Sequence, residues 1–159
     1  MRNQTNLLIL NLRIMKKYLF LMLLPMVIGL ASCDYHDKMI DLGELPTMST
    51  QFIEDAFPGC KVVAVNKDRD LGSVTYDVVL DCDVRLEFDN KGRWQEVDCE
   101  PGRVPDVVVP SLILSFVEER YPNNFIEKIE HKRSHYTVEL DIDIELVFDE
   151  NGNLKRIDD

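Results

Sequence analysis

The sequence predicts an α+β fold, a tandem repeat of helix–β–β–β units whose helices pack on one face of an antiparallel sheet and leave the other face exposed to solvent. Three observations lead to this prediction. Two long stretches alternate apolar and polar residues, an apolar helical pattern ending in aromatic–proline precedes each, and a hairpin signature follows each. Because the same order occurs twice, we expect one structural unit to be present in two copies.

The alternating stretches are Tyr76–Phe88 and Tyr136–Phe148. A period of two over this length is typical of a half-buried antiparallel strand. Their inward-facing sets would be Val78, Leu80, Cys82, Val84, Leu86 and Phe88 in the first stretch, and Val138, Leu140, Ile142, Ile144, Leu146 and Phe148 in the second.

A helix is expected before each stretch, opening at a proline that suits the first helical turn. Each ends at an aromatic–proline pair, since proline cannot continue a helix. The opening prolines are Pro46 and Pro110, and the closing pairs are Phe57-Pro58 and Tyr121-Pro122. The expected core face has Met48, Phe52 and Ala56 with Ile53 beside them, and Leu112 and Phe116 with Ile113 and Val117 beside them.

Shorter strands complete each unit. We expect first strands at Lys61–Val65 and Phe125–Ile129, and third strands at Arg93–Asp98 and Asn153–Asp158. The third strands follow hairpin turns in which Gly92 and Gly152 supply the left-handed conformation. The two repeats would therefore span residues 45–99 and 109–159, joined by a linker at 100–108.

The N-terminus has the pattern of an export signal. Lys16 and Lys17 precede an apolar run that ends in Leu30-Ala31-Ser32-Cys33, which resembles a bacterial lipobox. We therefore expect residues 1–32 to be a lipoprotein signal peptide, with Met15 as an alternative start, and residues 33–44 to be a tether. Acylation of Cys33 would anchor the protein to a membrane by lipid alone. The alternative is a transmembrane anchor, for which the apolar run is short.

The charge balance limits the possible partners. Of the 18 basic and 29 acidic residues, four basic and no acidic ones precede Cys33, so the mature chain would carry 14 basic and 29 acidic residues, a net charge of −15. Such a charge disfavours nucleic acid and favours basic partners or cations. Solubility on an exported surface would also explain it.

The cysteines after Cys33 are Cys60, Cys82 and Cys99. Disulfides persist in exported proteins, so one pair and one free thiol are expected. Cys82 and Cys99 flank a hairpin centred on Asn90-Lys91, which predicts a Cys82–Cys99 disulfide unless a bulge shifts the register. The three histidines are scattered, so no metal site and no cofactor are predicted.

The candidate binding residues lie on the expected outward faces of the long strands. Paired carboxylates could bind a basic partner or hold Ca²⁺, but a solvated strand face has the same pattern. No nucleophile or histidine lies beside them, so no catalytic residue is predicted and the protein is not expected to be an enzyme. Trp94 could anchor an interface or cap the core. The candidates are Asp81, Asp83, Arg85, Glu87, Trp94, Glu139, Asp141, Asp143 and Glu145.

The repeated motifs resemble the PepSY-like family of β-lactamase-inhibitor-like proteins exported by Bacteroidetes-type bacteria. The matching pieces are Pro46, Phe57-Pro58, Tyr76 to Leu80 and Phe88-Asp89 with Gly92, and Pro110, Tyr121-Pro122, Tyr136 to Leu140 and Phe148-Asp149 with Gly152. The resemblance implies tandem repeats whose sheet presents a concave surface to solvent, similar to that of β-lactamase inhibitor proteins. That family often has Asn-Gly between the halves of the long strand, where this chain has Asp81-Cys82-Asp83 and Asp141-Ile142-Asp143, so we expect the long strands to run unbroken.

These patterns together lead to one functional hypothesis and one alternative. We expect an exported, lipid-anchored lipoprotein of the cell envelope, periplasmic or surface-facing, that acts as a non-catalytic binding or inhibitory module. Its open acidic sheet face would engage a protein or peptide, for which a basic partner suits the charge. The alternative is a Ca²⁺-binding or envelope-stress accessory protein that uses the same carboxylates. Fold similarity alone does not imply that it inhibits a β-lactamase.

Overall fold

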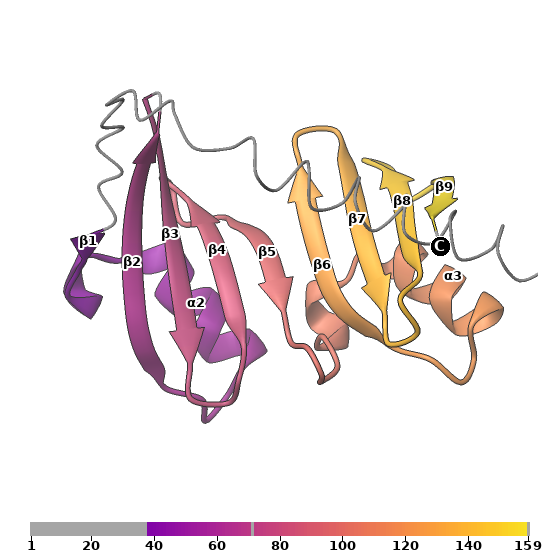
Figure 1. Cartoon of the computed structure of the whole chain (residues 1–159), viewed down its shortest axis with the longest axis horizontal. Helices are drawn as coiled ribbons and strands as arrows, with labels where there is room; N and C mark the ends of the chain where they lie inside the picture. The colour runs from indigo at the N-terminus through magenta and orange to yellow at the C-terminus, as the bar shows by residue number, and fades with distance from the viewer. Residues whose placement is uncertain (1–37, 71, 159) are drawn as a thin grey trace, which may run out of the picture. The chain divides into compact units, whose positions relative to one another are not determined.

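The computed structural model describes residues 38–70 and 72–158, which form one open sheet of nine antiparallel strands in sequential order. Two helices, α2 (Thr47–Ala56) and α3 (Ser111–Arg120), lie behind this sheet in Figure 1. The short 3₁₀ helices are η1 (Leu42–Glu44) and η2 (Asp106–Val108). The strands are β1 (Lys38–Met39), β2 (Val62–Asp70), β3 (Ser73–Leu80), β4 (Arg85–Asp89), β5 (Trp94–Asp98), β6 (Ile126–Lys132), β7 (His135–Leu140), β8 (Glu145–Asp149) and β9 (Leu154–Asp158).

The expected signal peptide and Cys33 lie outside these residues. Within the described part of the chain, no helix combines the length and the apolar character needed to cross a membrane.

Each helix covers the strands that follow it in the chain. We call Leu45–Cys99, with α2 and β2–β5, the first half, and Val109–Asp158, with α3 and β6–β9, the second half. Phe88 in β4 and Phe148 in β8 are fully buried, and each contacts a helix phenylalanine edge-to-face, Phe52 and Phe116 respectively. Aromatic pairs of this kind stabilise a core beyond the area that they bury.

The halves are joined through the sheet itself. Strands β5 and β6 pair at three positions, Glu96↔Glu130, Val97↔Ile129 and Asp98↔Lys128. The resulting core row runs through both halves as Val65, Val78, Leu86, Val97, Ile129, Val138 and Leu146.

The prediction of two unbroken long strands is wrong. The chain turns back between β3 and β4 and again between β7 and β8, through three-residue turns in which Asp83 (φ 61°) and Asp143 (φ 59°) adopt the left-handed conformation. A type I turn followed by a left-handed residue is a common three-residue hairpin loop, and aspartate tolerates that conformation better than most residues. The bond from Leu80 N–H to Val84 O (2.9 Å) closes the first turn, and that from Leu140 N–H to Ile144 O (3.0 Å) closes the second.

The helices form as predicted, immediately after Pro46 and Pro110, but their buried faces are rotated by about one residue from the expected one. Met48 and Leu112, placed in the core by the sequence pattern, are 55% and 61% exposed. Ile53, Ile113 and Val117, expected beside the core face, are instead its buried centre. Three or four apolar residues on a short helix fit two adjacent faces almost equally well, so the sheet decides which one is buried.

The predicted Cys82–Cys99 disulfide is also wrong, because the structure pairs Cys60 with Cys82. The break in the long strand places Cys82 in the β3–β4 turn, beside the residues that enter β2. Asp81 holds those residues: Lys61 N–H donates to Asp81 Oδ1 (2.8 Å) and Asp81 N–H donates to Lys61 O (2.9 Å). Cys99 is a buried free thiol. Its burial raises the pKa of the thiol to about 11, and the negative charge of Asp98 contributes further.

Candidate functional site

The candidate site is the open face of the sheet, opposite the helices. Four carboxylates occupy paired positions on four neighbouring strands: Asp77 of β3 pairs with Glu87 of β4, Glu87 with Glu96 of β5, and Glu96 with Glu130 of β6. We call these four residues the carboxylate row. Adjacent strands lie about 4.8 Å apart, so like charges in such a row repel one another.

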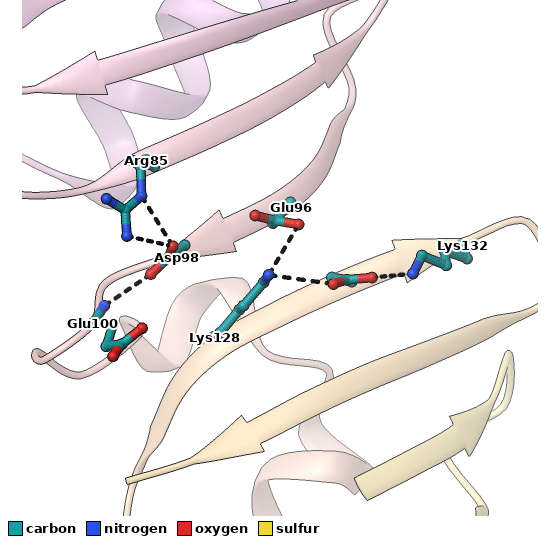
Figure 2. A network of polar contacts seen from close by, with 7 residues as sticks. Arg85, Glu96, Asp98, Glu100, Lys128 and Lys132 are labelled. Carbon is teal, nitrogen blue, oxygen red and sulfur yellow. Dashed lines mark hydrogen bonds and ion pairs between the residues drawn. The ribbon is translucent and has the colours of Figure 1, made fainter. Parts of the chain in front are cut away.

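A network of ion pairs surrounds one end of this row, where the two halves meet (Figure 2). The Lys128 ammonium lies 3.3 Å from Glu96 and 3.4 Å from Glu130, and Lys132 pairs with the other Glu130 oxygen. Burial alone would raise the pKa of Glu130, but its contacts with Lys132 and Lys128 lower it instead. Burial alone would lower the pKa of Lys128, but its contacts with Glu96 and Glu130 raise it instead. The β5–β6 end of the row is thus neutralised within the protein.

A second group of contacts lies alongside. Arg85 of β4 binds Asp98 of β5 through Nε (3.1 Å) and Nη2 (3.0 Å). The other Asp98 oxygen accepts a hydrogen bond from the backbone N–H of Glu100 (3.0 Å). Asp98 is therefore a structural carboxylate, since it fixes β4 and the chain that leaves β5 in place.

Glu87 differs from its neighbours in the row. Among residues 38–70 and 72–158 it has no ion pair and no hydrogen bond through its side chain, although it is half-buried. Burial raises the pKa of Glu87, and the charges of Asp77, Glu96 and Glu130 raise it further, against a smaller opposing effect of Lys132. An added cation near Glu87 would relieve this repulsion.

The structure divides the predicted binding residues into those on the open face, those in the turns, and Trp94 on the helix side. Arg85, Glu87, Glu139 and Glu145 lie on the open face as predicted, with Glu139 directly opposite Glu145. Asp81, Asp83, Asp141 and Asp143 do not lie on this face, because they form the two turns described above. Asp141 is bound like Asp81, accepting a hydrogen bond from the backbone N–H of Phe125 (3.0 Å).

Trp94 lies on the helix side of the sheet and packs against the core, which agrees with the second of the two roles considered for it. Its ring stacks on Phe52 of α2 with centroids 6.4 Å apart, and contacts His131 (5.7 Å) and Tyr136 (6.4 Å) of the second half. A β-bulge between Glu87 and Phe88, which pairs Phe88 with Trp94, turns the side chain to the helix side. Trp94 thus packs the two halves together.

The open face of the second half has a different character. The row that holds the carboxylates in the first half continues there through Thr137, Val147 and Arg156. An open depression of about 500 Å³ over this part is lined by acidic, basic and neutral residues: Glu130, Lys132, His135, Thr137, Glu145, Val147, Lys155 and Arg156. The predicted acidic face is therefore concentrated in the first half.

Sequence reasoning missed Glu96, Asp98, Lys128, Glu130 and Lys132. Lys128, Glu130 and Lys132 occupy alternate positions around the apolar Ile129. This alternation could have placed the three side chains on one face of a strand. Their meeting with β5 could not be predicted locally, because it depends on pairing between the halves.

Within the described residues, the one grouping with metal-ligand geometry is Cys60, Asp81 and Cys82. The two sulfurs are joined in the disulfide, so they do not act as thiolate ligands. This grouping gives no support for a metal site.

An open antiparallel sheet with α2 and α3 on one face defines an α+β protein, and within residues 38–70 and 72–158 neither helix covers the other face. A family model described as "Putative beta-lactamase-inhibitor-like, PepSY-like" matches residues 74–156. No match to a curated protein was found.

Solved structures of similar proteins come from Bacteroides. A putative periplasmic protein of the DUF2874 family from Bacteroides vulgatus is 37% identical, with a TM-score of 0.75, over 78% of this chain and 98% of that one. A putative calcium-regulated periplasmic protein from Bacteroides thetaiotaomicron is 36% identical, with a TM-score of 0.75, over 77% and 97%. A putative periplasmic protein of unknown function from Bacteroides vulgatus is 31% identical, with a TM-score of 0.75, over 77% and 99%.

The chain therefore belongs to the PepSY-like, β-lactamase-inhibitor-like family, and the resemblance inferred from the repeated motifs is confirmed.

Proposed function

We propose that this protein is a non-catalytic binding module of the cell envelope that engages a basic protein or peptide through the open face of its first half. The observation that carries the proposal is the carboxylate row, in which Glu87 is half-buried among like charges. The β5–β6 end of the row is already neutralised by lysines, whereas Glu87 has none within ion-pair distance in the described residues. A lysine or arginine from a partner would offset this repulsion on binding.

The architecture supports a binding role. We infer that the halves are two copies of one unit of a helix and four strands, joined edge to edge in the manner of β-lactamase-inhibitor-like proteins. Both have the same order of elements and both turn through an aspartate with positive φ. Pairing of β5 with β6 makes a sheet wide enough to receive a partner on the face opposite α2 and α3.

We also propose that Cys33 is acylated and holds the module in the envelope. The support is the Leu30-Ala31-Ser32-Cys33 sequence together with the description of similar proteins as periplasmic. Metabolic labelling with an alkyne fatty acid should label the wild-type chain and not Cys33→Ser. Equal labelling of both would show that Cys33 is not the lipidation site.

The binding role can be tested by capture from native envelopes with the variant Glu87→Gln. We expect the wild-type protein to retain a saturable partner and the variant to lose about tenfold in affinity, since one charge-assisted contact would be removed. The matched control is Glu139→Gln, which neutralises a carboxylate on the open face of the second half. Equal loss in both variants would show a general effect of net charge and contradict a site in the first half.

Ca²⁺ is a second candidate ligand. Hard oxygen ligands suit Ca²⁺, and one similar protein of 36% identity is described as calcium-regulated. In this version Ca²⁺, not a basic side chain, would offset the charge of Asp77 and Glu87.

Calorimetric titration with Ca²⁺ separates the two candidates. Saturable heat that Glu87→Gln removes and Glu139→Gln preserves would support the cation site. Absence of heat at millimolar Ca²⁺, with partner capture intact in the same buffer, would exclude the cation site and support protein binding.

A further inference from the structure

A cavity of a different kind lies between the two halves. Strands β5 and β6 stop pairing at Glu96↔Glu130, although β5 begins at Trp94 and β6 continues to Lys132. Beyond that pair the strands separate, and a cavity of about 300 Å³ opens between them. Its lining residues are Arg93, Gln95, His131 and Arg133.

Every residue that lines this cavity can donate hydrogen bonds from its side chain, and none of the four is a carboxylate. The chain as a whole has the opposite bias, with 29 acidic and 18 basic residues. A cavity whose described lining has two arginines and no carboxylate is therefore not what the average surface of this protein provides.

The donors are held in place by the fold. Asp89 binds Arg93 through Nε (2.7 Å) and Nη2 (2.6 Å), which fixes the guanidinium and leaves its other N–H groups available. Gln95 is tied to the backbone by a bond from Nε2 to Trp94 O (3.1 Å). Arg133, in the β6–β7 turn, has no ion pair within residues 38–70 and 72–158 and can turn toward a ligand.

The wall behind the donors is aromatic. The His131 ring stacks on Tyr136 with centroids 4.4 Å apart and lies 5.7 Å from Trp94. Burial lowers the pKa of His131, and the positive charge of Arg93 and the proximity of His135 lower it further. The positive charge of Arg93, one of the causes that disfavour a proton on His131, favours an anion in the cavity.

We propose that this cavity is a binding site for an oxyanion group, a carboxylate, phosphate or sulfate borne by a small molecule, held by Arg93, Gln95, His131 and Arg133. Arginine guanidinium groups match such oxygens in pairs, and the glutamine and histidine N–H groups complete the set. The site draws two residues from each half. It is independent of the carboxylate row, for which we proposed a ligand of the opposite charge.

Trp94 gives a direct readout, since it is the only tryptophan of the 159 residues and contacts His131. The full-length protein, purified in detergent, would be titrated with sodium phosphate, sodium sulfate and sodium acetate, each against sodium chloride at equal ionic strength. We expect a saturable change in Trp94 fluorescence with at least one oxyanion and none with chloride. The order of phosphate, sulfate and acetate affinities then shows which group the site prefers.

Two variants test the assignment. Arg133→Gln removes a charge from an exposed turn and should weaken binding at least about tenfold, the loss expected when a charged hydrogen bond is removed. Gln95→Ala should weaken it less. Lys61→Gln, which removes the same charge from an exposed position at the far end of the first half, should bind as the wild type does.

Two outcomes would overturn the proposal. One is a fluorescence change that follows ionic strength alike for chloride and oxyanions. The other is saturable binding, checked by calorimetry, that Arg133→Gln and Gln95→Ala leave unchanged while circular dichroism shows both variants folded.

Discussion

The first and second halves can be compared position by position, because their strands pair in the same register. On the helix side, Tyr76 pairs with Phe88 and Tyr136 with Phe148, and the neighbouring pairs are Val78 with Leu86 and Val138 with Leu146. On the open face, the positions that hold Asp77, Glu87 and Glu96 in the first half hold Thr137, Val147 and Arg156 in the second.

The difference shows which constraints act on each face. The helix side must fill the space beneath a helix, and close packing permits few alternatives. The open face makes no such demand, so its composition can follow a partner. Because three of the four residues of the carboxylate row lie in the first half, the open face is where the two halves differ in what they can bind.

The largest expected effect concerns the shared helix side. Phe88→Ala and Phe148→Ala should each lower the free energy of unfolding by about 3–5 kcal/mol, because each removes a fully buried ring from beneath a helix. Urea denaturation followed by circular dichroism would measure both. A loss below about 1 kcal/mol in either variant would show that its half is not packed as its counterpart is.

The next effect tests a feature found in the first half. The Cys60–Cys82 disulfide joins residues 22 apart in sequence, and the double variant Cys60→Ser, Cys82→Ser should lower the free energy of unfolding by about 2–4 kcal/mol. Reduction of the wild-type protein should give a similar loss, with no effect of reductant on the variant. Equal stability of the oxidised and reduced wild type would contradict the prediction.

The second half has Asn124 and Ile142 at the corresponding places. Phe125 N–H and Asp141 N–H make the same exchange of hydrogen bonds (3.0 and 3.1 Å) that Lys61 and Asp81 make beside the natural disulfide. Asn124→Cys, Ile142→Cys should therefore form a second disulfide and raise the free energy of unfolding by about 1–3 kcal/mol, measured against its own reduced form. Failure to oxidise would show that the two turns differ in geometry.

The alternation of the sequence was enough to predict the helix side of the sheet but not the turn that divides each long stretch. Leu80 and Val84 both point to the helices, and three turn residues lie between them. The apolar period of two therefore continues through the turn without a break. Asp83 and Asp143 adopt the positive φ that each turn requires. A glycine at either position would have been a clear sequence signal of a turn.

The candidate site was predicted in part for a related reason. Glu87 and Arg85 belong to an alternating stretch, so their face could be inferred from the sequence alone. Lys128 and Glu130 reach Glu96 only because β5 pairs with β6 across the junction. The face on which Trp94 lies depends on the bulge between Glu87 and Phe88, which the sequence pattern does not reveal.

A smaller effect concerns Ser49, which faces the Gly92 turn from α2. Ser49 is fully buried and its hydroxyl has no hydrogen-bond partner among residues 38–70 and 72–158, whereas Ile113 occupies the corresponding place in the second half. Ser49→Ala should raise the free energy of unfolding by about 1 kcal/mol, because it removes an unpaired polar group from the core. Ser111→Ala, at an exposed position of α3, is the control. A loss of stability in Ser49→Ala would show that the hydroxyl is bonded in solution.

The smallest effect tests whether the carboxylate row is electrostatically unfavourable in the free protein. The folded-state pKa of Glu87 is raised above its ordinary value of 4.5, chiefly by burial and then by Asp77, Glu96 and Glu130. The native state therefore holds a proton at Glu87 more tightly than the unfolded chain does, so the contribution of Glu87 to stability falls as the pH rises through that raised pKa.

Glu87→Gln carries no charge at any pH and should exceed the wild type in stability at pH 7 by a few tenths to about 1 kcal/mol, the size expected for like charges on paired strands. At pH 4, below the ordinary value, the two proteins should converge. Urea denaturation at both values would measure this difference, with Glu118→Gln on α3 as the control. A gain of the same size at both pH values would mean that Glu87 is unfavourable through its burial and not through its charge. The second half, with uncharged Val147 at this position, would then differ from the first in packing alone, and a basic partner would gain nothing from the row.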